Sequence, residues 1–230
     1  AVSGQDNRDE MGVCLEPAQY VTGLDRFEQY EYHTAWERGG LSERSGAGDL
    51  DVVIYSARKW LRLALQGNPT VLLPLFVPEA EIVAVSPLGY DLRANVARIV
   101  SKRCGARFLG YMRAQRDGML GLRSRDVNRP ELVARYGYDT KYAMHMLRLT
   151  IQGIELLSTG AITLPIAEPQ LSMLREVRTG GYNRREVLDL AASLEADLEQ
   201  LLETTALPAE PDHEWANQWL YHAYTTHWQA

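Results

Sequence analysis

The chain has 230 residues, 46% hydrophobic and 23% charged, which is ordinary for a globular protein of one or two domains. Its net charge of -6 argues against broad, sequence-independent nucleic-acid binding, because such binding depends on cations that neutralise phosphates. No apolar run is long enough for a membrane span, no signal-peptide pattern opens the chain and two cysteines are too few for a disulfide framework, so a cytoplasmic protein with no membrane partner is expected.

The first part of the chain favours strands mixed with helices. Residues 7–15 predict a strand that ends before Pro17, and residues 27–33 alternate roughly as a second strand should. Residues 37–48 are rich in glycine, serine and charge and predict a surface loop. The β-branched segment 50–55 then predicts a third strand.

A helix is expected directly after the third strand. Ser56 is suited to its N-cap, and Gly67 stops it. Five apolar residues fall on one face of this helix: Ala57, Trp60, Leu61, Ala64 and Leu65.

From about Leu88 onward the pattern is helical. One helix is expected around residues 92–100, its continuation or a second helix around residues 108–119, and a short helix that opens at Pro130. Asp139 or Thr140 is expected to cap a long helix that runs to about Ser158.

Two more helices are expected near the end of the chain. Residues 183–186 resemble a capping box for a helix that runs to about Thr204, and Asp212 is expected to cap the last helix. The tryptophans of that helix are interpreted as packing residues. The sequence thus divides into a mixed domain, residues 1–87, and an α-helical domain, residues 88–230.

Acidic residues on two of the predicted strands suggest a metal site. Asn7 and Asp9 share one strand face, while Asp6, Arg8 and Glu10 share the other. Asp51 interrupts an apolar strand and would lie opposite Asp9 if the strands were neighbours. Such oxygen ligands suit Mg²⁺, which substrate phosphates often help to bind. A lone acid near a chain start is more commonly a solvated loop residue. Asp49, just before the third strand, is interpreted as a solvated loop end.

Four blocks of sequence add a resemblance to these patterns. They are residues 9–13 (Asp-Glu-Met-Gly-Val), residues 51–60 with Asn68-Pro69, residues 129–145, and residues 155–160 (Glu-Leu-Leu-Ser-Thr-Gly). Together they resemble the predicted nucleotidyltransferases of the DNA polymerase β superfamily, in the bacterial and phage branch related to the RNA-repair-ligase-associated polynucleotidyltransferase. The match covers most of the chain, and the third block is long and specific.

The resemblance implies an α+β fold, in which a polymerase-β-like nucleotidyltransferase domain with a mixed sheet is followed by an α-helical domain. It also implies transfer of a nucleoside monophosphate from an NTP with Mg²⁺ or Mn²⁺. Asp9 matches the second acid of the family's Asp-x-Asp pair, and Asp51 matches the third acid. Both are therefore expected to be catalytic and to bind metal.

Two departures from the family pattern stand out. The first acid of the pair falls on Asn7, whose side-chain oxygen can bind a metal but carries no charge, so metal affinity should fall. Asp6 would substitute for it only if the strand were bulged. The family's Gly-Ser motif would lie before Ala1, because Ser3-Gly4 is reversed and too close to Asp9. We therefore expect the sequence to be a fragment.

Several cations and aromatic residues are candidates for nucleotide contacts. On the long helix a polar stripe is formed by Lys141, His145, Arg148 and Gln152. It is either a solvated face or, as the family block around Lys141 favours, a phosphate-binding surface that His145 joins. Lys59 either contacts phosphate near a helix N-terminus or belongs to the wet face of its helix. Tyr138 either stacks on a base or packs.

Three hypotheses of different classes follow, of which the least specific is a structural or partner-binding helical protein. The first is a Mg²⁺-dependent nucleotidyltransferase in which Asp9 and Asp51 bind metal, Asn7 is a weak third ligand, and Lys141 holds the triphosphate. Its acceptor would be an RNA end, a protein or a small molecule. The alternative is a catalytically weakened or inactive module of the same fold that binds a nucleotide or RNA.

Overall fold

The computed structural model describes residues 7–41, 43, 45–122 and 129–229. The chain divides into two compact units. The sheet unit consists of residues 1–64 together with residues 212–230, and the helical unit consists of residues 65–211. The sequence prediction set the boundary at residue 87 and placed the last helix with the other helices. In the structure that helix belongs to the sheet unit.

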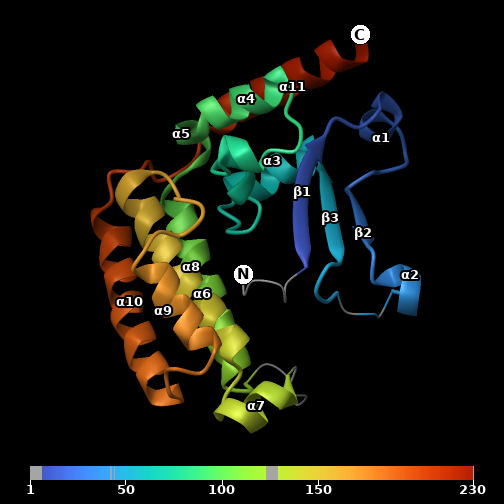
Figure 1. Ribbon diagram of the computed structural model, residues 1–230. Coiled ribbons are helices and arrows are strands. Elements are labelled where there is room, and N and C mark those ends of the chain that lie inside the picture. The colour runs from blue at the N-terminus through green and yellow to red at the C-terminus, as the bar shows by residue number, and fades with distance from the viewer. Residues whose placement is uncertain (1–6, 42, 44, 123–128, 230) are drawn as a thin grey trace. The chain divides into compact units, whose positions relative to one another are not determined.

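The sheet unit contains the mixed sheet that the sequence predicts (Figure 1). Its elements are β1 (Arg8–Cys14), α1 (Ala18–Thr22), β2 (Gln29–His33), α2 (Trp36–Gly39), β3 (Leu50–Ser56), α3 (Ala57–Leu65) and α11 (His213–Gln229). The strand order is β1-β3-β2, with β3 parallel to β1 and antiparallel to β2. The β-branched strand β3 is therefore central, as its composition favours.

A helix follows β3 without a loop. The Ser56 side chain accepts a hydrogen bond from the backbone N–H of Lys59 at 3.2 Å, which confirms it as the cap of α3. The apolar face predicted for this helix is buried: Ala57, Trp60, Leu61, Ala64 and Leu65 are each at most 8% exposed. This tight strand-to-helix junction fixes the end of β3 in the core of the sheet unit.

The last helix is fastened to the sheet unit through a buried carboxyl group. Glu16 is 2% exposed, and its Oε2 accepts a hydrogen bond from the Tyr224 hydroxyl at 2.8 Å. The Trp228 indole donates to the Glu16 carbonyl at 3.0 Å, and the same tyrosine oxygen accepts from the Arg58 backbone N–H at 3.2 Å. The two bonds to Glu16 join segments more than two hundred residues apart in sequence, which sequence periodicity cannot reveal.

The helical unit is built from longer helices and a few short ones. Its elements are the 3₁₀ turns η1 (Leu73–Leu75) and η2 (Glu79–Glu81), and the helices α4 (Pro87–Ala94), α5 (Val96–Ile99), α6 (Lys102–Met119), α7 (Pro130–Tyr136), α8 (Thr140–Thr159), α9 (Gln170–Arg178) and α10 (Arg184–Thr204). The capping box at Asn183 and Glu186 is confirmed, as is the Asp139 cap of α8. The predicted helix over residues 92–100 breaks at Asn95, and α9 was not predicted.

Helices α6, α8 and α10 pack closely where glycines allow it (Figure 1). A Cβ added at Gly105 of α6 would lie 2.6 Å from Leu157 and 2.7 Å from Leu202. A Cβ at Gly153 of α8 would lie 2.9 Å from the Cβ of Phe108. The close approach buries apolar side chains between the helices and makes α8 a rigid support for the residues on its other face.

The loop before β3 is more structured than the sequence predicts. It contains α2, and Asp49 is 4% exposed rather than a solvated loop end. Arg38 donates two hydrogen bonds of 2.6 Å to the Asp49 carboxylate, while Thr34 donates one of 2.8 Å. The pKa of Asp49 is held well below its usual range, first by Arg38 and then by the Gly46 N–H and Thr34. Asp49 is therefore a structural acid that fixes the approach to Asp51.

Within the part of the chain that the structure describes, no helix has the length and apolar character that crossing a bilayer requires.

Candidate functional site

The two predicted catalytic acids face each other across neighbouring strands. Asp9 on β1 is paired in parallel register with Asp51 on β3. The Arg8 guanidinium meets the Glu10 carboxylate at 2.5 Å, so these two side chains share a face of β1 that Asp9 does not. The predicted alternation of β1 and the predicted pairing of Asp9 with Asp51 are both confirmed. Asp6 lies outside the described residues.

Asn7 lies between the two carboxylates. Its Nδ2 donates to Asp9 Oδ1 at 2.9 Å and to Asp51 Oδ2 at 2.5 Å. One amide group thus donates hydrogen bonds to an oxygen of each acid, much as a cation shared by two carboxylates would contact an oxygen of each. In this arrangement the Asn7 side chain presents its donor to the acids, and its oxygen would bind a metal only after the amide turns over.

Two further donors hold the other oxygen of Asp51. His33 Nδ1 donates to Asp51 Oδ1 at 2.8 Å, and the Ser45 hydroxyl donates to the same oxygen at 2.5 Å. His33 is also the direct partner of Asp51 in the antiparallel ladder between β2 and β3. Oδ1 of Asp51 is therefore bound by protein donors, while Oδ2 faces Asn7 and Asp9.

Asp51 stays ionised at neutral pH in this environment. Burial raises its pKa, but the hydrogen bonds from Ser45, His33 and Asn7 act in the opposite direction and outweigh burial, so the pKa lies below the usual value. The side chain is 16% exposed. A charged, oriented and partly buried carboxylate is what a hard divalent cation needs as a ligand.

The donor set fits such a cation. Asp9 and Asp51 each offer a carboxylate oxygen toward the same amide hydrogen-bond donor, so both oxygens lie within reach of one point. Over the described ranges, no group of three His, Cys, Asp or Glu side chains is arranged as a metal site. The metal ligands that the sequence predicts, the Asp9 and Asp51 carboxylates and the Asn7 carboxamide, stay a prediction.

Lys59 lies at the other end of β3 from Asp51. Its ammonium group donates to Gln29 Oε1 at 2.6 Å and lies 3.8 Å from the Glu28 carboxylate. Gln29 is paired with Tyr55, four residues along the strand from Asp51, and a strand rises about 3.3 Å per residue. The structure therefore does not bring Lys59 together with the acids, and its contacts agree with the alternative of a polar helix face.

Tyr138 is a packing residue rather than a base-stacking one. Its side chain is 2% exposed, and its hydroxyl donates to the Tyr182 carbonyl at 2.6 Å. With its ring in the core of the helical unit, it offers no face to a base. The interpretation of Tyr138 as a nucleotide contact is corrected by its burial. Asn68 is likewise structural, because its Oδ1 accepts from the N–H groups of Thr70 and Val71.

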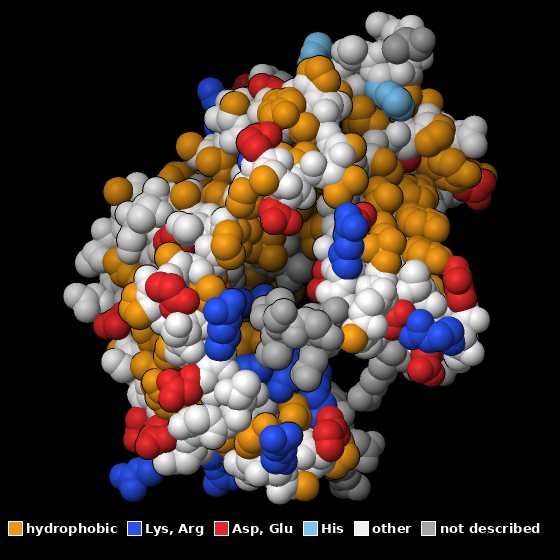
Figure 2. All heavy atoms as spheres, in the orientation of Figure 1, with side chains coloured by type: hydrophobic (Ala, Val, Ile, Leu, Met, Phe, Trp, Pro, Cys, Tyr) orange, Lys and Arg blue, Asp and Glu red, His pale blue; other side chains and the backbone are white. Residues whose placement is uncertain are grey.

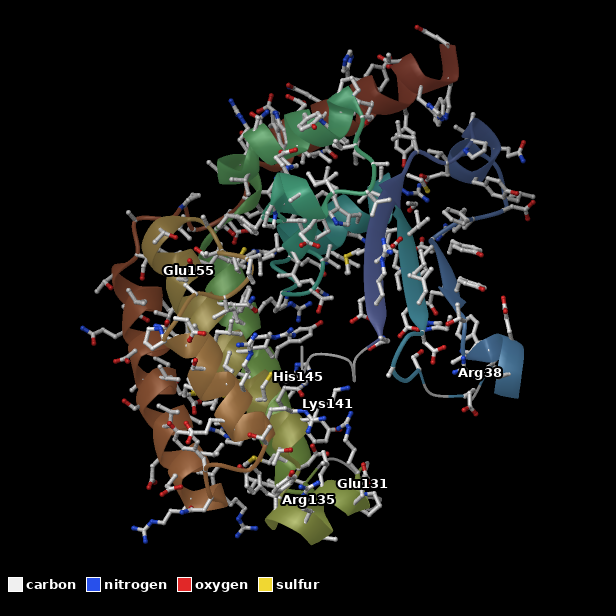
Figure 3. All side chains as sticks on the ribbon, in the orientation of Figure 1. Arg38, Glu131, Arg135, Lys141, His145 and Glu155 are labelled. Carbon is white, nitrogen blue, oxygen red and sulfur yellow. The ribbon has the colours of Figure 1, made fainter. Side chains whose placement is uncertain are left out.

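A cluster of cations surrounds His145 in the helical unit. Lys141 and His145 lie together on one side of α8 (Figure 3), and Lys and Arg side chains gather beside the start of this helix (Figure 2). Two arginines from other segments contact residues at the start of α8. Arg129 Nη1 lies 3.1 Å from Asp139 Oδ2, and Arg178 Nη1 donates to Thr140 Oγ1 at 3.2 Å. We call Arg129, Lys141, His145, Arg148 and Arg178 the basic cluster.

The charges of the basic cluster affect the pKa of its histidine, His145. Burial lowers the pKa of His145, and the charges of Arg148, Lys141, Arg129 and Arg178 lower it further, to about 4. His145 is therefore neutral at pH 7 because protonating it would add one more positive charge to a desolvated, cationic region. The predicted polar stripe is not a fully solvated face, since Gln152, its last member, is 4% exposed.

A family model covers nearly the whole chain. The model of the RNA repair pathway DNA polymerase beta family matches residues 2–222. The chain belongs to this family. Comparison with curated proteins and with solved structures gave no significant match.

Membership of the RNA repair pathway DNA polymerase beta family confirms the predicted resemblance and, with the small mixed sheet and the many helices, the α+β fold. It indicates a nucleotidyltransferase-like protein of polymerase-β type.

Sequence reasoning missed several residues of both candidate sites. His33 was recognised only as part of a strand and Ser45 only as part of a loop, and the strand register is what brings His33 to Asp51. Arg129 and Arg178 lie on segments distant from Lys141, so helical spacing could not connect them. A signal was present for Arg129, which opens the third block of the family resemblance.

Proposed function

We propose that this member of the RNA repair pathway DNA polymerase beta family transfers a nucleoside monophosphate from an NTP to a hydroxyl group, with Mg²⁺ bound by Asp9 and Asp51. The observation that carries the proposal is the direct pairing of these two acids on parallel strands, with one amide donor between their carboxylates. In the reaction the acceptor hydroxyl loses its proton to water and its oxygen bonds to the α-phosphorus, the bond from that phosphorus to the bridging oxygen breaks, and pyrophosphate leaves.

Asp9 and Asp51 would hold the metal, and Asn7 would add a neutral oxygen once its amide turns. When bound, the metal neutralises phosphate charge and favours the ionised form of the attacking hydroxyl. The protein contributes an Asp51 carboxylate that is already ionised and oriented before substrate arrives, so little reorganisation of this group accompanies the reaction.

The basic cluster is the second part of the proposal. We propose that it binds phosphate groups, since four cations converge there from three segments and Lys141 offers an ammonium group to an anion. An anion in this cluster would offset the charges that now depress the pKa of His145. Adding inorganic tripolyphosphate without metal should therefore raise the His145 pKa by about one unit or more, as followed by NMR of its ring protons. An unchanged pKa at saturating tripolyphosphate would argue against the cluster as a phosphate site.

Transfer itself is tested with α-labelled NTPs, Mg²⁺ or Mn²⁺, and RNA, protein and small-molecule acceptors. Asp51→Asn should reduce label transfer by at least about a hundredfold, because it removes a charged ligand of the catalytic metal. Glu10→Gln is the matched control, since Glu10 neighbours Asp9 on the opposite face of β1 and should leave transfer unchanged. Equal transfer by the wild-type protein and Asp51→Asn would reject the proposal.

The position of Asn7 also supports a second candidate function, a module of the same fold that binds a nucleotide or RNA without catalysis. The Asn7 amide already satisfies both carboxylates by hydrogen bonding. Calorimetry separates the two functions. NTP binding that is independent of Mg²⁺ and unaffected by Asp9→Ala would favour the binding module, whereas metal-dependent binding lost in Asp9→Ala would favour the transferase.

A further inference from the structure

His33 contacts Asp51 directly, although the two residues lie on different strands. It is the last residue of β2 and the register partner of Asp51, and its Nδ1 lies 2.8 Å from Asp51 Oδ1. The two side chains are 24% and 16% exposed, respectively. A hydrogen bond in such a partly buried position is only weakly replaced by water, so it restrains the carboxylate.

The imidazole of His33 is itself held in place. Its ring packs on the indole of Trp36 with centroids 4.3 Å apart and planes inclined by 49°. Trp36 opens α2, and Arg38 in the same helix is bound to the buried Asp49, two residues before Asp51. The helix that supports the histidine ring is therefore anchored at Asp49, the residue directly before the strand that carries Asp51.

The two oxygens of Asp51 accept hydrogen bonds from different donors. Oδ1 accepts from His33 and Ser45, while Oδ2 accepts from Asn7, the residue that also donates to Asp9. Oδ2 is thus the oxygen directed toward Asp9. A carboxyl group turns readily about its last side-chain bond, so these donors restrain the plane of the carboxylate and keep one of its two equivalent oxygens directed toward Asp9.

We propose that His33 is a positioning residue for nucleotidyl transfer, which binds Oδ1 of Asp51 so that Oδ2 is presented toward Asp9 for a divalent cation. This inference rests on the proposed function of Asp9 and Asp51. A residue that only stabilised the pairing of β2 with β3 would not have this role. Loss of an outer hydrogen-bond partner of a metal ligand typically weakens metal binding by about 10- to 100-fold.

Two variants separate positioning from general stability. His33→Leu removes the donor and keeps an apolar side chain against Trp36. His33→Asn keeps a donor, because the asparagine Nδ2 occupies nearly the same place as the histidine Nδ1. His222→Leu is the control, since His222 is an exposed histidine on α11 of the same unit. Thermal unfolding of all three checks that each protein is folded.

The first readout is Mn²⁺ affinity, measured by electron paramagnetic resonance without nucleotide. We expect His33→Leu to weaken Mn²⁺ binding by about 10- to 100-fold, His33→Asn to remain within about threefold of the wild type, and His222→Leu to bind as the wild type does. Wild-type affinity in His33→Leu, or equal loss in the leucine and asparagine variants, would overturn the proposal.

The second readout is the tautomer of His33, observed through the ¹⁵N shifts of its ring in the metal-free protein. The hydrogen bond to Asp51 requires a proton on Nδ1, whereas a neutral imidazole in water favours the other nitrogen. We expect the Nδ1–H tautomer in the wild type and its loss in Asp51→Ala. The same tautomer in both proteins would mean that Asp51 does not bind His33.

The two readouts distinguish failure of this inference from failure of the proposed function. If Asp51→Asn abolishes Mn²⁺ binding and transfer but His33→Leu affects neither, the role of His33 is refuted and the transferase stands. If the wild-type protein neither binds Mn²⁺ through Asp51 nor transfers label, the proposed function fails and the positioning role fails with it. The Nδ1–H tautomer of His33 would then show only a hydrogen bond to Asp51 that stabilises the fold.

Discussion

The side-chain amide of Asn7 bridges Asp9 and Asp51, with Nδ2 at 2.9 Å from Asp9 Oδ1 and 2.5 Å from Asp51 Oδ2. The resemblance drawn from the sequence implies an acid at this position. The substitution therefore does more than remove a charge, because it places a hydrogen-bond donor between the two remaining acids. Metal binding at this point has to displace that donor.

Replacing Asn7 by aspartate should tighten Mn²⁺ binding by about tenfold or more, since it adds a charged ligand and removes the competing donor. The metal-free variant should unfold at a lower temperature than the wild type, because three carboxylates then face one another, and Mg²⁺ should restore its Tm. Electron paramagnetic resonance gives the affinity, and calorimetry with and without Mg²⁺ gives the Tm. Asn7→Ser, which is neutral, is the control. Equal affinity in the aspartate and serine variants would contradict this account.

The ion pair of Arg38 with Asp49 should make stability depend on pH. The pKa of Asp49 is lowered in the folded protein, so its contribution is present above the unfolded value near 3.9 and is lost as pH falls toward the folded value. Asp49→Asn should therefore be less stable than the wild type at pH 7, and this difference should shrink below about pH 4. Urea unfolding at pH 7, 5 and 3.5 measures it. A difference that stays constant over this range would exclude Asp49 as the source.

His145 should destabilise the protein in mild acid. Its folded pKa of about 4 lies below the ordinary value of 6.5, so the unfolded chain binds a proton first as pH falls between these values. The free energy of unfolding should drop by roughly 3 kcal/mol across that window, because one pKa unit corresponds to about 1.4 kcal/mol. His145→Gln should flatten this part of the profile, while His222→Gln should not. Parallel profiles for the wild type and His145→Gln would disprove the assignment.

The bond between Tyr224 and Glu16 should account for much of the attachment of α11 to the sheet unit. Burial and the contact with Glu16 raise the pKa of the Tyr224 hydroxyl well above its usual value, so it remains a donor. Tyr224→Phe should lower the free energy of unfolding by about 1–3 kcal/mol, because it leaves a buried carboxyl oxygen without this donor. Tyr221→Phe is the control, since Tyr221 is 74% exposed. Hydrogen exchange should localise the effect to α11.

Close packing of α6 should make two glycines of the same helix respond in opposite ways. Gly105→Ala should destabilise by about 1–3 kcal/mol, because the new methyl group would meet Leu157 and Leu202. Gly110→Ala should stabilise by roughly 0.5–1 kcal/mol, because its Cβ meets nothing within 4 Å and alanine favours the helix. Chemical unfolding of both variants gives the comparison. A change of the same sign in the free energy of unfolding of both variants would indicate that helix propensity, rather than packing, determines the effect of the substitution.

The sequence predicted local structure well wherever a local interaction sets it. The caps at Ser56, Asp139 and Asn183 depend on side chains two or three residues from the groups they bind, so composition and spacing were enough. The common face of Asn7 and Asp9 follows from strand alternation alone. The short helix α9 escaped prediction, and the helix over residues 92–100 was predicted without its break at Asn95.

By itself, then, the sequence determined the family and predicted that Asn7 and Asp9 share a strand face opposite Asp51. Only the tertiary structure decided what surrounds them. Strand pairing brought His33 to Asp51, and helix packing brought Arg178 to the first turn of α8, because such contacts join residues far apart in the chain and leave no periodic trace. Burial likewise decided that Asp49 and Tyr138 serve the fold, since the same residue types would be equally plausible as ligands if they were exposed.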